Sequence, residues 1–142
     1  MEIRKTKHVG SYGVIINNGK VLLIRKARGA YTGKLDLPGG GIDYGETPIE
    51  TLKREILEEV GVNVVSYKIK TALTHYEVWQ QEKDLQEDLS HYAIIYDVKI
   101  SDDDISKIKK NPDGIDSLGS NWYDIESLDI NELSPLAKVI KE

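Results

Sequence analysis

Hydrophobic and polar residues alternate along several segments of the chain, which is the pattern of strands with one buried and one exposed face. The alternation is clearest where every second residue is apolar, at Tyr92, Ile94, Tyr96, Val98 and Ile100. Comparable patterns predict strands at residues 8–16, 20–26, 65 to about 79, 92–100 and 121–125. Asn18-Gly19 predicts a tight hairpin turn between the first two strands. The charged residues 80–90 are expected to connect two strands.

A helical period marks residues 47–61, where the apolar side chains recur four positions apart at Leu52, Ile56 and Val60. Thr47 suits the N-cap, and Glu50 three residues later completes a capping box. Gly61 suits the C-terminal end, where the chain adopts a left-handed conformation. The sequence therefore predicts one well-delimited helix of about three and a half turns.

Shorter helical segments are predicted at residues 104–109 and from Ser134-Pro135 to about residue 141. Strands that precede and follow the main helix, with a second helix near the end, indicate an α+β fold with a mixed sheet. A chain of 142 residues with 39% hydrophobic content is expected to form a single domain, residues 1–142.

The main helix carries an acidic face. Glu55, Glu58 and Glu59 are three and four positions apart, so their carboxylates converge within one turn, and such like charges destabilise an isolated helix. A solvated acidic surface is one interpretation. The alternative is a hard divalent cation such as Mg²⁺, which prefers oxygen ligands. The glycines at 39–41 favour the cation, because they allow backbone to approach a ligand closely.

These residues form part of a long motif. Gly40 is followed by Glu46 and then by the run Arg54-Glu55-Ile56-Leu57-Glu58-Glu59-Val60-Gly61-Val62, with Leu37-Pro38-Gly39-Gly40 just before it. Residues 40–62 resemble a complete Nudix box, the signature of the Nudix hydrolases, including those of the MutT-like type. So many fixed positions make a chance match far less probable than for a short glycine motif.

The resemblance implies the Nudix fold, a mixed sheet sandwiched between helices (α/β/α). It also implies metal-dependent hydrolysis of the pyrophosphate bond in a nucleoside diphosphate linked to another group, with release of a monophosphate and Mg²⁺ (or Mn²⁺) as cofactor. Carried over by position, Glu58 and Glu59 are metal ligands, and Glu55 is a ligand or the general base. The carbonyl of Gly39 is a backbone ligand. Arg54 is expected to orient these carboxylates, and Glu46 to have a structural role.

Residues outside the box give weaker indications. Arg25, Lys26 and Arg28 follow a strand and are candidates for phosphate binding, as is the backbone of Gly40, but a solvated strand end explains the cations equally well. Three acids are candidates for a further ligand or base: Asp113, Asp116 and Glu87. His75 and His91 are expected to be ordinary sheet residues. Four aromatic residues are candidates for stacking on a base, although aromatic residues in strands more often belong to the core: Tyr31, Tyr76, Trp79 and Tyr92.

Composition limits the remaining choices. The chain has no cysteine, which excludes disulfides and thiolate chemistry and is consistent with the cytoplasm. No segment resembles a signal peptide or a membrane span. A net charge of −5 argues against an extended nucleic-acid partner, and hence against a decapping-type hydrolase acting on RNA ends. A small nucleotide is the expected partner, and a homodimer is possible. A Nudix-fold binding domain without catalysis is the main alternative, although this chain keeps every box carboxylate.

Overall fold

The computed structural model describes residues 1–108 and 117–142, and in these residues seven strands form one mixed sheet. The strands are β1 (Glu2–Asn17), β2 (Lys20–Lys26), β3 (Leu35–Asp36), β4 (Gly39–Gly41), β5 (Val64–Glu82), β6 (Leu85–Ile100) and β7 (Ser117–Asp124). The helices are α1 (Pro48–Val60) and the 3-10 segments η1 (Asp102–Lys107), η2 (Ile130–Glu132) and η3 (Ala137–Lys141). The main strand order is β3-β2-β1-β6-β5, with β4 paired to β1 and β7 to β2.

The sheet is mixed because β1 runs parallel to β6 while the other pairs are antiparallel. Asn18 and Gly19 connect β1 to β2, and both have positive φ, at 51° and 75°. That conformation is the one that a two-residue hairpin turn requires. The predicted hairpin is therefore confirmed.

Residues 80–90 differ from the sequence prediction. Instead of a charged connection, β5 continues to Glu82 and β6 starts at Leu85, so only Lys83 and Asp84 form the turn. The polar residues remain in strands because β6 is paired on both sides, for example Leu89 with Glu77 of β5 and with Thr6 of β1. The charged composition of residues 80–90 gives no indication of this backbone pairing.

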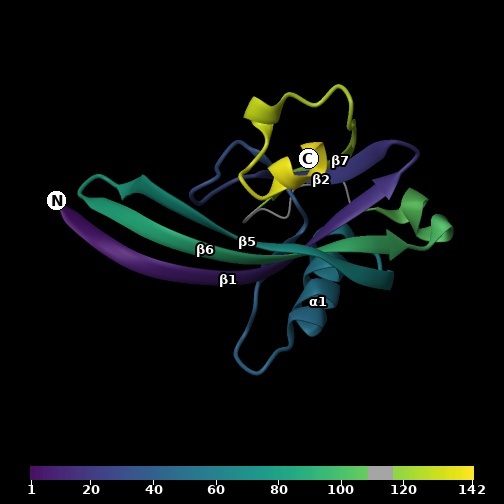
Figure 1. Cartoon of the computed structure of the whole chain (residues 1–142), viewed down its shortest axis with the longest axis horizontal. Helices are drawn as coiled ribbons and strands as arrows, with labels where there is room; N and C mark the ends of the chain where they lie inside the picture. The colour runs from purple at the N-terminus through teal and green to yellow at the C-terminus, as the bar shows by residue number, and fades with distance from the viewer. Residues whose placement is uncertain (109–116) are drawn as a thin grey trace.

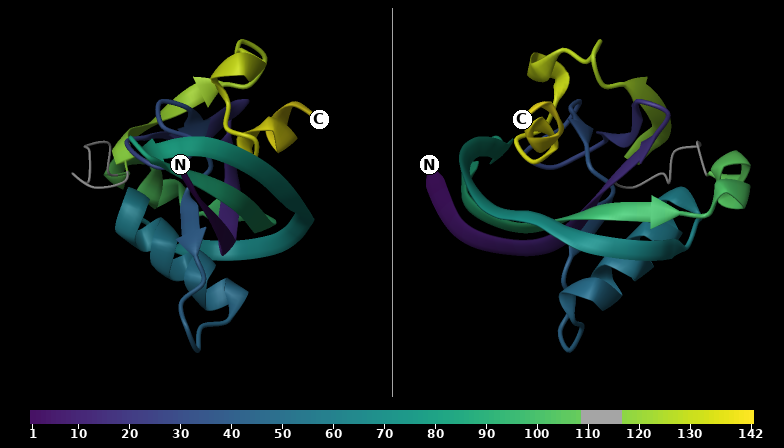
Figure 2. Two further views of the ribbon diagram at one scale, coloured as in Figure 1. Left: turned by 90° about the vertical axis from the view of Figure 1, so that its left-hand side faces the viewer. Right: turned by 45° about the vertical axis from the view of Figure 1, so that its right-hand side comes forward.

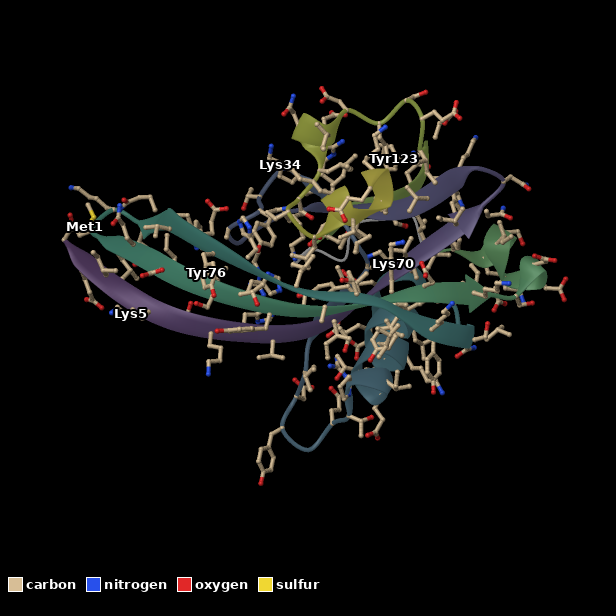
Figure 3. All side chains as sticks on the ribbon, in the orientation of Figure 1. Met1, Lys5, Lys34, Lys70, Tyr76 and Tyr123 are labelled. Atoms are coloured by element: carbon tan, nitrogen blue, oxygen red, sulfur yellow. The ribbon has the colours of Figure 1, made fainter. Side chains whose placement is uncertain are left out.

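The ends of β1, β5 and β6 around the N-terminus and the Lys83-Asp84 turn extend beyond the rest of the molecule as a curled, three-stranded arm (Figures 1 and 2). Met1, Lys5 and Tyr76 lie along this arm, well away from Tyr123 of β7 (Figure 3). The inner face of the arm forms one wall of a cavity.

Helix α1 forms as the sequence predicts. The Thr47 side chain accepts a hydrogen bond from the Glu50 N–H, the Glu50 side chain accepts one from the Thr47 N–H, and Gly61 ends the helix with a φ of 76°. The apolar stripe of the helix packs on one face of the sheet (Figure 1). The buried residues of that layer include Ile15, Leu22, Leu52, Ile56, Val60, Tyr96 and Val98.

A second hydrophobic layer lies on the opposite face of the sheet, beneath the C-terminal segment (Figure 1). It includes Tyr12, Val14, Leu23, Leu35, Ile95, Leu133, Leu136 and Val139. The structure thus has the α+β sandwich expected from the sequence. The predicted C-terminal helix is the 3-10 helix η3, and the Val139 N–H donates to the Leu136 carbonyl. Because residues three apart eclipse in a 3-10 helix, Leu136 and Val139 both face the core.

Candidate active site

The carboxylates of α1 converge on the short strand β4. The backbone N–H of Gly39 donates to Glu59 Oε1 at 2.8 Å. Gly40 is close to Glu55: a Cβ at position 40 would lie 2.6 Å from the Glu55 carboxyl carbon. Gly40 therefore leaves the space that the Glu55 carboxylate occupies. Residues 39–41 form the strand β4, which is one side of the carboxylate cluster.

Arg54 connects the remaining acids of the motif. Its Nε donates to Glu46 Oε2 at 2.6 Å, and its Nη1 lies 2.8 Å from Glu55 Oε1 and 3.3 Å from Glu58 Oε2. Its Nη2 also donates to the Gly41 carbonyl at 3.3 Å. The hydrogen bonds from Arg54 and Thr51 lower the pKa of Glu46 to about 2. Arg54 therefore contacts Glu46, Glu55 and Glu58 at once, and its orienting role and the structural role of Glu46 stay predictions.

Burial controls the protonation of the two inner carboxylates. Removal from water raises the pKa of Glu59 to about 8, against the opposing effect of the Gly39 hydrogen bond. Burial also raises the pKa of Glu55, although Arg54 opposes that rise. Both groups would gain from a nearby cation that stabilises their ionised forms.

The donor set suits a hard divalent cation, since Glu55, Glu58, Glu59 and backbone carbonyls of residues 39–41 all offer oxygen. The small volume of Gly40 keeps the Glu55 carboxylate against β4. Within residues 1–108 and 117–142, no three acidic or histidine side chains are arranged closely enough to hold a metal ion in the observed conformation. Arg54 and the Gly39 N–H hold the carboxylates in the observed arrangement.

A cavity of about 1090 Å³ starts at this cluster and continues along the inner face of the arm. Glu55, Glu58 and Glu59 line it at one end, together with Gly39 and Gly40. Lys26 and Arg28 also line the cavity, whereas Arg25 is not among its lining residues and donates to the Gly33 carbonyl at 2.9 Å. The candidate acids Asp113 and Asp116 lie outside the described residues.

A row of hydrogen-bonded rings lines the middle of the cavity. His91 Nε2 lies 2.8 Å from the Tyr12 hydroxyl, and His91 Nδ1 lies 2.8 Å from the Tyr31 hydroxyl. Tyr12 also contacts His8, and the His8 and His91 rings are 4.7 Å apart. Burial, with the nearby His8, His75 and Lys26 as smaller causes, lowers the pKa of His91 to about 3. Its imidazole is neutral at pH 7, so one tyrosine donates to it and the other accepts from it.

The sequence prediction for His91 as an ordinary sheet residue missed this network. The chain has three histidines, and the register places all of them in one row, His8 beside His91 and His91 beside His75. The sequence contained one signal, because His8 and Tyr12 are four residues apart and so share a face of β1. The pairing of β1 with β6 could not be read from it.

Glu87 lies at the far end of the cavity. Its Oε1 accepts a hydrogen bond from Trp79 Nε1 at 2.6 Å, and its Oε2 accepts one from the Thr6 hydroxyl at 2.9 Å. The strands β1, β5 and β6 each supply one of these residues, and all three side chains line the cavity. The structure thus places Glu87 on the cavity wall, away from Glu55, Glu58 and Glu59.

The family assignment follows from comparison with known proteins. The profile of the NUDIX domain matches residues 6–142. The chain therefore belongs to the NUDIX family. This confirms the resemblance of residues 40–62 to a Nudix box, and members of the family generally use divalent metal ions.

Three curated relatives are similar to part of this chain. A protein named nucleoside triphosphatase NudI from Enterobacter sp. (strain 638) is 50% identical over 34% of this chain and 36% of its own length. A protein named 8-oxo-dGTP diphosphatase from Escherichia coli (strain K12) is 44% identical over 35% of this chain and 40% of its own length. A protein named RNA pyrophosphohydrolase from Helicobacter pylori (strain G27) is 58% identical over 23% of this chain and 21% of its own length. The chain thus matches well under half the length of these relatives.

Solved Nudix structures share the fold over nearly the whole chain. A MutT NUDIX hydrolase from Burkholderia pseudomallei has a TM-score of 0.63 and 20% identity, and the match covers 95% of each chain. A NUDIX hydrolase from Nitrosomonas europaea has a TM-score of 0.68 and 19% identity, with 96% of this chain and 86% of that chain covered. Among the described residues, no helix is long and apolar enough to cross a membrane.

Proposed function

We propose that this Nudix protein hydrolyses the pyrophosphate bond of a nucleoside diphosphate linked to another group, and releases a monophosphate. The observation that carries the proposal is the convergence of Glu55, Glu58 and Glu59 on Gly39 and Gly40 at one end of the cavity. The names of the relatives, which describe triphosphatase, diphosphatase and pyrophosphohydrolase activities, support the same reaction.

Glu58 and Glu59 would hold Mg²⁺, with Glu55 as a further ligand or as the base and the Gly39 carbonyl as a backbone ligand. When bound, the cation would polarise the phosphoryl oxygens and lower the pKa of the attacking water. Manganese, with the same preference for oxygen, is expected to substitute.

The chain supplies charge and position around that centre. Arg54 holds Glu55 and Glu58 toward each other, with its Nη1 within 3.3 Å of both. Lys26 and Arg28 line the cavity and would balance the phosphate charge, and the open backbone at Gly40 would allow close approach of the substrate. Arg25 remains a prediction, since it would reach a phosphate only by leaving the Gly33 carbonyl.

The proposal also includes the domain organisation, the cellular compartment and the oligomeric state. We treat residues 1–142 as one domain, and the absence of cysteine favours the cytoplasm. A homodimer remains a prediction that sedimentation would check.

The test is phosphate and monophosphate release over a panel of nucleotides with Mg²⁺ or Mn²⁺, with Glu58→Gln beside the wild type. The panel contains nucleoside triphosphates, a dinucleoside polyphosphate, ADP-ribose and a nucleotide sugar. We expect turnover of one class, lost in Glu58→Gln and kept in Glu132→Gln, which removes the same charge from η2.

Absence of turnover on every nucleotide, while Mg²⁺ still binds, would overturn the proposal in favour of a non-catalytic binding domain. Turnover restricted to a 5′-triphosphorylated oligonucleotide, with strongly salt-dependent binding, would instead indicate a hydrolase of RNA ends.

A further inference from the structure

Glu87 is a fixed carboxylate with unused acceptor capacity. Trp79 Nε1 and the Thr6 hydroxyl each donate to one of its oxygens, at 2.6 and 2.9 Å, so the group is held from two neighbouring strands. An ionised carboxylate can accept about four hydrogen bonds. A ligand with two adjacent hydrogen-bond donors would therefore occupy the remaining acceptor positions of the Glu87 carboxylate. A hydrogen-bond acceptor or an anion placed there would be repelled.

The position of Glu87 separates it from the proposed metal centre. On the inner face of β6 it lies four residues before His91, or roughly 13 Å along the strand. The glutamate cluster lies beyond His91 in the other direction, because Gly40 pairs with Ser11, and Ser11 is level with Ile94. Since metal–oxygen bonds are about 2.0–2.6 Å long, Glu87 belongs to the other end of the cavity and not to the metal.

The charge along the cavity changes in three steps. The glutamate cluster lies at one end, and the charge of Lys26 is close enough to oppose the rise in the pKa of Glu59, which suits a metal-bound diphosphate. The rings of His8, His91 and Tyr31 line the middle, and burial lowers the pKa of both histidines, so these rings are uncharged at pH 7. Glu87 lies at the other end, beside Trp79. A row of neutral aromatic rings suits a nucleoside, whose sugar and base carry no charge.

We propose that Glu87 is a specificity-determining residue that recognises the base of a guanine nucleotide. Among the common bases only guanine presents two adjacent N–H donors on one edge, at N1 and the 2-amino group, which match the two oxygens of a carboxylate. Adenine presents an amino group beside a bare ring nitrogen, which would face Glu87 with a lone pair. This inference rests on the proposed function, because it places the diphosphate of the same nucleotide at the glutamate cluster.

The first experiment compares kcat and KM for GTP, ITP and ATP with Mg²⁺ in the wild type, Glu87→Gln and Asp88→Asn. ITP differs from GTP only in lacking the 2-amino group. We expect the wild type to favour GTP over ITP and ATP by about tenfold or more, mostly in KM, the discrimination of a good bidentate contact. Glu87→Gln should bring the three values of kcat/KM close together. Asp88→Asn removes the neighbouring charge of β6 and should keep the preference.

A second experiment separates this inference from the proposed function. Calorimetric titration with the non-hydrolysable methylene-bridged analogues of GTP and ITP measures recognition without turnover. Binding that favours the GTP analogue in the wild type, and loses that preference in Glu87→Gln, supports the role of Glu87 even if no nucleotide is hydrolysed.

Hydrolysis without any base preference would overturn the assignment of Glu87 and leave the proposed function standing. A nucleotide sugar preferred over GTP would also overturn it, because a sugar diol would then be the donor pair. If Glu87→Gln fails to fold, Glu87→Asp keeps the charge but withdraws the carboxylate, and an undiminished preference for GTP in that variant would contradict the inference. The wild-type ranking of GTP, ITP and ATP tests it without any variant.

Discussion

The backbone N–H of Gly39 donates a hydrogen bond to the carboxylate of Glu59, 2.8 Å away, and so joins strand β4 to the last turn of helix α1. Gly39 reaches this position with a φ of +147°, and a Cβ there would lie 2.2 Å from the Ser11 carbonyl oxygen. Neither the conformation nor the space suits another residue.

We therefore expect Gly39→Ala to lower the free energy of unfolding by about 3 kcal/mol or more. Chemical denaturation would measure the loss. Gly45→Ala is the matched control: its φ is +82° and nothing lies within 4 Å of its Cβ, so only backbone strain of about 1 kcal/mol is expected. Equal losses of unfolding free energy in the two variants would show that the contact between the new Cβ and the Ser11 carbonyl does not destabilise the protein.

The neighbouring glycine should behave differently. A Cβ at Gly40 would lie 2.6 Å from the Glu55 carboxyl carbon, and that flexible side chain can move. We expect Gly40→Ala to retain the fold but to displace Glu55, with a loss of metal affinity or kcat of roughly 10–100-fold. Metal titration, turnover and thermal unfolding would be measured on the same sample. Unchanged turnover would mean that the position of Glu55 against β4 is unimportant for the reaction.

The capping box at the start of α1 should contribute stability without affecting chemistry. Thr47 accepts from the Glu50 N–H and Glu50 accepts from the Thr47 N–H. Thr47→Ala is expected to lower the free energy of unfolding by about 1 kcal/mol. Thr47→Ser, which keeps the hydroxyl, should restore most of it. A loss of turnover larger than the loss of stability would indicate that the cap also positions the carboxylates.

His91 should make stability depend on pH in a defined direction. Burial lowers its pKa from 6.5 to about 3, so the unfolded chain binds a proton that the folded protein does not. The contribution of His91 to the free energy of unfolding is therefore fully present above pH 6.5. It is lost as the pH falls from 6.5 toward 3. The slope attributable to it is at most about 1.4 kcal/mol per pH unit.

Denaturation curves between pH 7 and pH 5 would measure that slope. His91→Gln retains a donor and an acceptor for Tyr12 and Tyr31 but does not titrate, so its stability should vary less with pH. Tyr31→Phe removes one hydrogen bond to His91 and leaves the imidazole, so it should lower stability while the slope persists. A slope that survives in His91→Gln would assign the pH dependence to other groups.

Local signals determined much of this protein. The helix between Thr47 and Gly61, the Asn18-Gly19 hairpin and the acidic face of Glu55, Glu58 and Glu59 depend on residues close together in the chain, where propensity and spacing fix the geometry. The family likewise followed from a continuous motif, residues 40–62, and was confirmed by the match over residues 6–142.

Strand pairing decided the rest. The network at His91 and the position of Glu87 depend on β1 lying beside β6 in one particular register, and that register joins residues about eighty positions apart. The same pairing kept the charged residues 85–90 in a strand, where composition predicted a connection. A shift of one residue would reverse the face of every side chain, and nothing local specifies it, because the buried faces that select the register form only when the sheet closes over the core. The sequence alone therefore placed Glu55, Glu58 and Glu59 on one face of a helix, and only the tertiary structure placed His91 and Glu87 along the same cavity.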